Sequence, residues 1–128
     1  MDIRSLQKRS KFRDALSCPT GLCCVSADFE GLIFPMNEIE LMARAEAQIS
    51  AEPRTQFIGK NDRLRQLIYV QRSRIFRFPD TIWIQAVDHG SDTAILIYSR
   101  SSYGYWDLGA NRRRVHRWLL KLGENINN

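Results

Sequence analysis

The chain has 128 residues, of which 44% are hydrophobic and 26% are charged. This length fits one domain that buries its own core, and apolar residues recur often enough to exclude disorder over most of the chain. The 19 lysines and arginines exceed the 14 acidic residues, so the formal net charge is +5. That excess fits either an ordinary basic surface or a specific anionic partner.

The start of the chain is basic and polar, without the apolar stretch of a secretory signal. Nowhere does the sequence carry the run of about 18 apolar residues that a membrane span needs. We interpret residues 1–17 as a lead-in, 18–123 as a single α+β domain and 124–128 as a frayed tail. As written, the sequence predicts a cytoplasmic protein. If a leader has been removed, it predicts a periplasmic or membrane-associated one.

Cys18, Cys23 and Cys24 lie in or beside a turn-forming segment. An odd number of cysteines in a chain without a signal argues against a disulfide framework. Three interpretations stay open, namely reduced structural thiols, a local disulfide between Cys18 and Cys23, and a metal site. Because His89 and His116 are distant in sequence, zinc is the least favoured, and we predict no metal and no cofactor.

A helix over residues 38–50 is the first regular element that the sequence predicts. Asn37 suits its N-cap, with Glu40 three residues later. Four apolar residues then recur at helical spacing: Ile39, Met42, Ala45 and Ile49.

Several β-rich segments separated by turn residues follow this helix. The expected strands are 55–58, 64–71, 81–87 and 93–99. The last of these is almost entirely apolar, which predicts a central strand covered on both faces. A second amphipathic helix is expected over 112–122, closed by Gly123. Short connections favour antiparallel neighbours, so we predict an α+β fold with an antiparallel sheet of about four to five strands and two main helices packed on one face.

Three consecutive arginines at the start of the last helix form the most informative pattern. Asn111 is expected to be the N-cap, and Arg112, Arg113 and Arg114 follow it directly. Cations are unfavourable at a helix N-terminus, because the backbone dipole there is already positive. Negative charge should therefore lie nearby.

Two sources of that negative charge are open. Asp80 and Asp107 could neutralise the arginines in a structural network, or an external anion could bind the free amides of the helix start. Guanidinium groups suit the second case, because they bind carboxylates and phosphates through paired hydrogen bonds. The candidate anion- or ligand-binding residues are Arg72, Arg77, Arg100, Tyr105, Asn111, Arg112 and Arg114.

The aromatic residues Tyr103, Tyr105 and Trp106 accompany these arginines. Such residues can stack on a ligand or a partner, although core and rim positions are commoner. No nucleic-acid-reading motif is present, so nucleic acid is disfavoured as a partner.

The sequence contains none of the common catalytic motifs. The only conceivable nucleophile and base are Cys23 or Cys24 with His89 or His116. We predict no catalytic residue and a non-enzymatic binding or accessory domain that engages an anionic small molecule or a partner protein. An uncharacterised enzyme that uses a cysteine or a tyrosine, and a nucleic-acid-binding protein, are the alternatives.

Several segments together resemble a bacterial family that is catalogued as domain of unknown function 1499. They are Tyr69–Ser73, Phe78–Asp80, Tyr98–Ser101, Gly104–Tyr105, Asp107–Gly109 and Asn111–Val115. The resemblance covers residues 18–122, and the segment 18–23 is also similar to many proteobacterial members, from which Cys24 departs. It implies no activity, substrate or cofactor. It does imply that the arginines and Asp107 belong to the family's motif, and that many relatives carry a leader, which we do not expect in this sequence as written.

Overall fold

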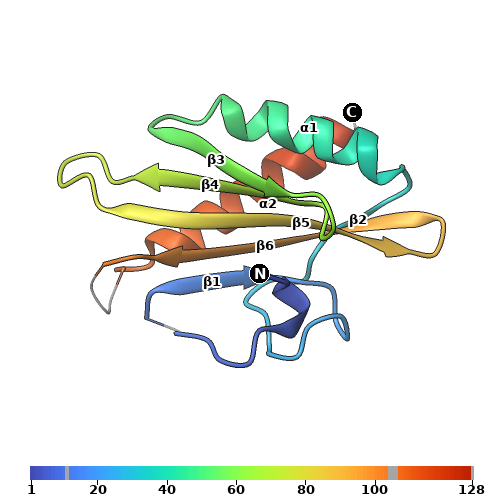
Figure 1. Cartoon of the computed structure of the whole chain (residues 1–128), viewed down its shortest axis with the longest axis horizontal. Helices are drawn as coiled ribbons and strands as arrows, with labels where there is room; N and C mark the ends of the chain where they lie inside the picture. Colours follow the sequence, from blue (N-terminus) through green and yellow to red (C-terminus); the bar gives the residue numbers. More distant parts are fainter. Residues whose placement is uncertain (11, 104–106, 128) are drawn as a thin grey trace.

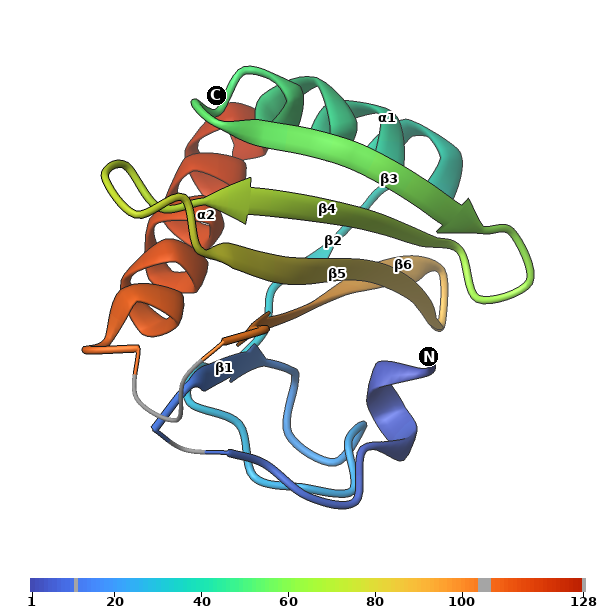
Figure 2. The ribbon, with the colours of Figure 1, turned by 60° about the vertical axis from the view of Figure 1, so that its left-hand side comes forward.

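The structure is a computed structural model that describes residues 1–10, 12–103 and 107–127. Two α-helices lie on one face of a sheet, and the N-terminal segment lies beside the opposite face (Figures 1 and 2). In chain order the elements are η1 (Ile3–Ser5), β1 (Asp14–Ser17), β2 (Ile33–Phe34), α1 (Glu38–Ser50), β3 (Thr55–Asn61), β4 (Gln66–Arg72), β5 (Pro79–His89), β6 (Asp92–Ser101) and α2 (Ala110–Asn127).

The sheet has the order β1-β6-β5-β4-β3, and β2 also pairs with β6. All of these strand pairs are antiparallel, so the predicted α+β class is confirmed. The sheet has six strands, slightly more than the four to five expected. The extra strands, β1 and β2, share one edge of β6 and are too short to produce a clear alternating pattern in the sequence.

Strand β6 is covered on both faces, as its apolar sequence predicted. Ile95 and Ile97 point into the main core between the sheet and the two helices. Leu96 and Tyr98 point to the opposite face, where they contact a second cluster that includes Ile3. Since side chains alternate along a strand, a single apolar strand supplies both cores.

The N-terminal segment is part of this second core. Ile3 is fully buried, and its backbone N–H donates to Gln85 Oε1 at 3.0 Å. Gln85 Nε2 in turn donates to Asp2 Oδ1 at 2.8 Å. The segment that the sequence assigned to a lead-in therefore contains a buried anchor and strand β1. Ile3 is the single buried apolar residue before β1, so the sequence shows no periodicity from which the buried anchor could be predicted.

Helix α1 has the bounds that the sequence predicted, and the Asn37 side chain accepts the N–H of Glu40 at 2.9 Å. The predicted buried stripe is only partly right. Leu41, Ala45 and Ile49 are buried, whereas Ile39 is 78% exposed. The stripe follows the spacing from Leu41, which places Ile39 on the outer side of the helix.

Helix α2 is longer than the predicted 112–122 and continues through the segment assigned to a frayed tail. Gly123 lies within the helix and does not end it. Ile126 still packs against the main core, which gives the last turn a reason to stay helical. Over the described residues, no helix combines the length and apolarity that would carry it across a membrane.

Cys18 and Cys23 form a disulfide, and Cys24 is an exposed free cysteine. The bond closes the short turn that begins at the end of β1.

Ile3 lies in the second core and Ile39 on the surface, so alanine at these positions should change the free energy of unfolding by different amounts. Replacing Ile3 by alanine is expected to lower the free energy of unfolding by about 2–4 kcal/mol, because it leaves a cavity in the second core. The matched control Ile39→Ala should change it by less than about 0.5 kcal/mol, since Ile39 is exposed. Chemical denaturation measures both, and equal values would show that the N-terminal segment does not pack as described.

The cysteines give a second test. Unfolded in denaturant without reductant, the protein should expose one thiol to a thiol reagent, from Cys24. After reduction, Cys18 and Cys23 should react as well. Reaction of all three cysteines before reduction would contradict the disulfide.

Candidate binding site at the start of α2

Strands β4, β5 and β6 and helix α2 meet at one end of the sheet, which we call the loop end. The end of β4 pairs with the start of β5 through Arg72 and Pro79, and Asp80 pairs with Ser101 at the end of β6. The loop end comprises these strand termini, the β4–β5 loop 73–78, the described parts of the β6–α2 loop and the first turn of α2. Residues from distant parts of the sequence therefore lie together there.

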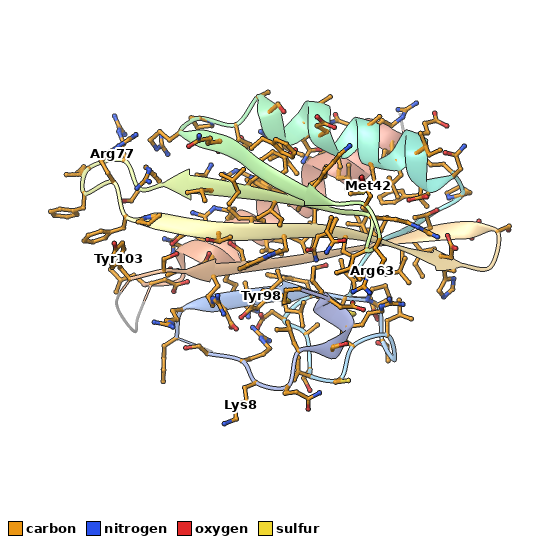
Figure 3. All side chains as sticks on the ribbon, in the orientation of Figure 1. Lys8, Met42, Arg63, Arg77, Tyr98 and Tyr103 are labelled. Atoms are coloured by element: carbon orange, nitrogen blue, oxygen red, sulfur yellow. A yellow bond between two sulfur atoms is a disulfide. The ribbon has the colours of Figure 1, made fainter. Side chains whose placement is uncertain are left out.

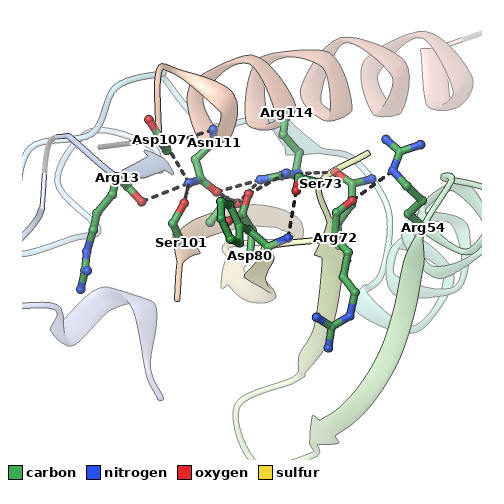
Figure 4. A network of polar contacts seen from close by, with 12 residues as sticks. Arg13, Arg54, Arg72, Ser73, Asp80, Ser101, Asp107, Asn111 and Arg114 are labelled. Carbon is green, nitrogen blue, oxygen red and sulfur yellow. Dashed lines mark hydrogen bonds and ion pairs between the residues drawn. The ribbon is translucent and has the colours of Figure 1, made fainter. Parts of the chain in front are cut away.

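Asn111 is the centre of a buried polar network at the loop end (Figure 4). Its Nδ2 donates to Ser101 Oγ at 2.9 Å and to the backbone oxygen of Arg13 at 3.0 Å. Its Oδ1 accepts hydrogen bonds from Ser99 Oγ at 2.5 Å and Arg114 Nη1 at 2.7 Å. The side chain is 0% exposed. A fully bonded amide in this position ties β1, β6 and α2 together.

Arg114 extends the network across the sheet. Its Nη2 donates to Asp80 Oδ2 at 2.9 Å, and its Nε donates to Gln71 Oε1 at 2.5 Å. Burial lowers the pKa of the Arg114 guanidinium, and the Asp80 carboxylate opposes that shift. The buried charge is therefore supported by its acidic partner and by neutral hydrogen-bond acceptors.

Asp107, and not Asn111, caps the start of α2. Its Oδ1 accepts the N–H of Gly109 at 2.7 Å, and its Oδ2 accepts the N–H of Asn111 at 3.1 Å. The same Oδ2 also accepts Asn111 Nδ2 at 2.7 Å. The prediction of Asn111 as N-cap was wrong, because its side chain turns inward and a carboxylate supplies the negative charge that helix amides favour.

The three consecutive arginines separate in space. Arg112 pairs with Asp28 at 3.2 Å and lies over the Phe29 ring at 4.9 Å. Arg113 donates to the backbone oxygen of Leu108 at 3.0 Å, whereas Arg114 enters the core. Helical geometry spreads consecutive side chains around the axis, so each finds a different partner.

The other predicted site residues do not converge on these three. Arg100 lies over the Trp83 ring at 5.4 Å, on the face of β6 opposite to Ser99 and α2. Arg72 and Arg77 belong to the β4–β5 loop region, where Arg72 Nη1 donates to the backbone oxygen of Arg77 at 3.1 Å. Tyr105 lies outside the described residues, as do Gly104 and Trp106.

Sequence reasoning missed several members of these networks. Gln71 and Ser99 were interpreted only as strand residues, and Ser101 as the start of a loop, although all three side chains lie on the helix-covered face. Asp28 gave no signal, because it lies 84 residues before its partner Arg112.

A pocket of about 410 Å³ opens directly beside the network. Asp80, Ser101, Asp107, Ser73 and Ala110 contribute to its lining. Its apolar walls come from the two loops: Phe76, Phe78, Tyr103 and Leu108. The rings of Phe76 and Phe78 stack at 5.6 Å, and Phe78 lies 6.3 Å from Tyr103.

The backbone beside this pocket is strained. Leu108 has φ 56° and Arg77 has φ 60°, in the left-handed region that non-glycine residues seldom adopt. Strain of this kind persists where surrounding contacts enforce it, and it is common at functional sites. At Leu108 the strain places a large apolar side chain in solvent.

Residues 10–122 match the family described as "Protein of unknown function (DUF1499)". The chain belongs to this family. No curated protein and no solved structure matches the chain significantly. The match covers the sheet from β1 onward, α1 and most of α2, so the family's shared region includes the whole buried network.

The cysteines and histidines considered for the enzyme and metal alternatives do not line this pocket. Cys23 is bonded to Cys18, so Cys24 is the only free thiol of the chain. His116 stacks on Phe29 with ring centroids 5.3 Å apart. Within residues 1–10, 12–103 and 107–127, no three histidines, cysteines or acids are grouped so as to hold a metal ion.

The buried network predicts unequal roles for neighbouring arginines. Arg114→Leu should lower the free energy of unfolding by about 3–5 kcal/mol, because it leaves Asp80 buried without its partner. The control Arg113→Leu should cost less than about 0.5 kcal/mol, since that side chain is exposed. Chemical denaturation of both variants measures the difference.

A double-mutant cycle separates the ion pair from packing. Asp80→Asn should cost clearly less in the Arg114→Leu background than in the unmodified protein, because the two side chains interact directly. Strictly additive effects would show that the pair does not contribute as a unit.

Proposed function

We propose that this protein is a non-enzymatic binding domain that binds an amphiphilic anion, or a partner that presents such a group, at the loop end. The apolar part enters the pocket beside α2, and the anionic part faces the arginines of the β4–β5 loop. The observation that carries this proposal is the ring of exposed apolar side chains around the pocket: Phe76, Phe78, Tyr103 and Leu108.

These side chains have no evident structural reason to be exposed. A contiguous apolar patch on a domain surface usually marks an interaction site. The described bases of both loops are hydrogen-bonded, because Ser73 N–H donates to the Phe78 backbone oxygen at 2.9 Å and Ser102 N–H donates to that of Pro79 at 3.1 Å. Residues that are ordered before binding lose less conformational freedom on binding, which favours affinity.

The charge around the pocket favours an anion at its rim. The segment 72–79 contains three arginines and no acid. Arg74 and Arg77 are exposed, and neither guanidinium has a partner within the described parts of the chain. The two carboxylates in the lining are already engaged, Asp80 by Arg114 and Asp107 by the amides of α2. The accessible charge therefore comes from guanidinium groups, which pair well with phosphate, sulfate and carboxylate.

The interactions of Asp80 and Asp107 also argue against catalysis in this pocket. A general base needs a free lone pair directed at a substrate. Asp80 Oδ2 is engaged by Arg114, and both carboxylate oxygens of Asp107 accept hydrogen bonds from backbone amides.

Calorimetric titration with decyl sulfate below its micelle concentration tests the proposal. We expect saturable binding, and Phe78→Ser should weaken it about tenfold because it removes one apolar wall of the pocket. The matched control is Phe57→Ser, since Phe57 is 46% exposed against 54% for Phe78 and does not line the pocket.

Neutral decyl maltoside should bind more weakly than decyl sulfate, because it offers nothing to the arginines. The proposal fails if decyl sulfate does not bind, or if Phe57→Ser weakens binding as much as Phe78→Ser. Equal affinity for the neutral compound would remove the anionic part of the proposal.

A further inference from the structure

One exposed apolar residue at the loop end has no contact with the pocket. Ile75 is 80% exposed and is absent from the pocket lining. Its neighbour Phe76 lines the pocket and is still 74% exposed. A small ligand inside the pocket would leave Ile75 in water. The tip of the β4–β5 loop therefore fits an occupant broader than a single small molecule.

We propose that this tip, with Ile75 and Phe76 at its apex, docks into the interfacial region of an anionic lipid bilayer. The inference rests on the proposed function, because it identifies the amphiphilic anions as lipids within a membrane surface. A bilayer offers an apolar layer for the tip and a dense layer of negative headgroups for the arginines.

The sequence of the tip has the composition of an interfacial anchor. Arg74 and Arg77 flank Ile75 and Phe76 directly. The apolar stem of an arginine can stay beside buried apolar side chains while its guanidinium reaches the headgroups. Basic residues near an anionic surface attract it, and aromatic residues favour the boundary between headgroups and hydrocarbon.

The position of the tip favours contact with a flat surface. The β4–β5 loop lies at one extreme of the longest axis of the molecule (Figure 1). Arg77 and Tyr103 lie at that same end (Figure 3). Tyr103, which is close to Phe78, and Leu108 on the adjoining loop extend the exposed apolar surface of the tip.

The charges of the molecule favour this orientation. The loop at the opposite end of β5 and β6, residues 88–92, contains Asp88 and Asp92, and Arg65 pairs with Asp88 at 2.7 Å. The charges at that end are therefore mixed, whereas the segment 72–79 carries three arginines and no acid, so an anionic surface attracts the tip more strongly. This asymmetry supports an anionic bilayer over an uncharged apolar partner.

Co-sedimentation with vesicles tests the inference. The protein should bind vesicles of phosphatidylcholine mixed with phosphatidylglycerol, and bind pure phosphatidylcholine vesicles clearly less. Ile75→Ser should weaken binding to the mixed vesicles about tenfold, because it removes a side chain from the apolar layer. The control Ile39→Ser changes an equally exposed isoleucine on α1 and should bind as the unmodified protein does.

A matched pair of double variants tests the contribution of charge to vesicle binding. The double variant Arg74→Gln and Arg77→Gln should lose most binding to the mixed vesicles, because each basic residue near the surface adds attraction. The control, Lys60→Gln with Arg63→Gln, removes two positive charges from the opposite end of the sheet and should retain binding. An equal loss in both would indicate that only net charge matters and would overturn the docking site.

Decyl sulfate separates this inference from the proposed function. Ile75→Ser should leave decyl sulfate binding unchanged, since Ile75 does not line the pocket, whereas Phe78→Ser should weaken binding to both decyl sulfate and vesicles. Decyl sulfate binding without vesicle binding would overturn the bilayer proposal, leave the proposed function in place, and point to a soluble ligand or a partner protein. Vesicle binding unaffected by Ile75→Ser would overturn the inference as well.

Discussion

The guanidinium of Arg114 lies inside the protein and pairs there with Asp80, and the loop end is organised around this ion pair. A buried charge is costly unless each of its hydrogen-bonding groups finds a partner. Gln71, Ser99 and Asn111 complete that set from two strands and the helix. Because the partners come from separate segments, the pair can form only when β4, β5, β6 and α2 are already in register.

This network separates the structural residues of the loop end from those available for binding. The side chains that turn inward fix the starts and ends of the strands and the first turn of α2. The loops between these fixed points can then hold strained and apolar residues in solvent, such as Leu108. The segments that carry the family resemblance supply most of the network, including Gln71, Asp80 and Arg114. Their shared pattern therefore has a direct structural explanation.

The crowding of three arginines at a helix start is resolved by three different acids. Asp107 caps the helix amides, Asp80 neutralises Arg114, and Asp28 pairs with Arg112. Of the two sources of counter-charge that the sequence left open, the internal one is present in the structure. The proposed ligand site is accordingly built on other arginines, Arg74 and Arg77, which lie on the neighbouring loop.

The elements with local signals could be predicted from the sequence. The cap at Asn37, the apolar run of β6 and the amphipathic start of α2 follow from neighbouring residues, because helical and strand periodicities act over a few positions. The directions of the polar side chains at the loop end depend on the tertiary structure. Asn111 left its expected capping role because Ser99, Ser101 and Arg13 surround it, and Arg112 turned to Asp28, 84 residues away. Which residues pair depends on their proximity in three dimensions and on the free-energy cost of leaving a buried polar group without a hydrogen bond. Neither can be inferred from the spacing of residues along the chain.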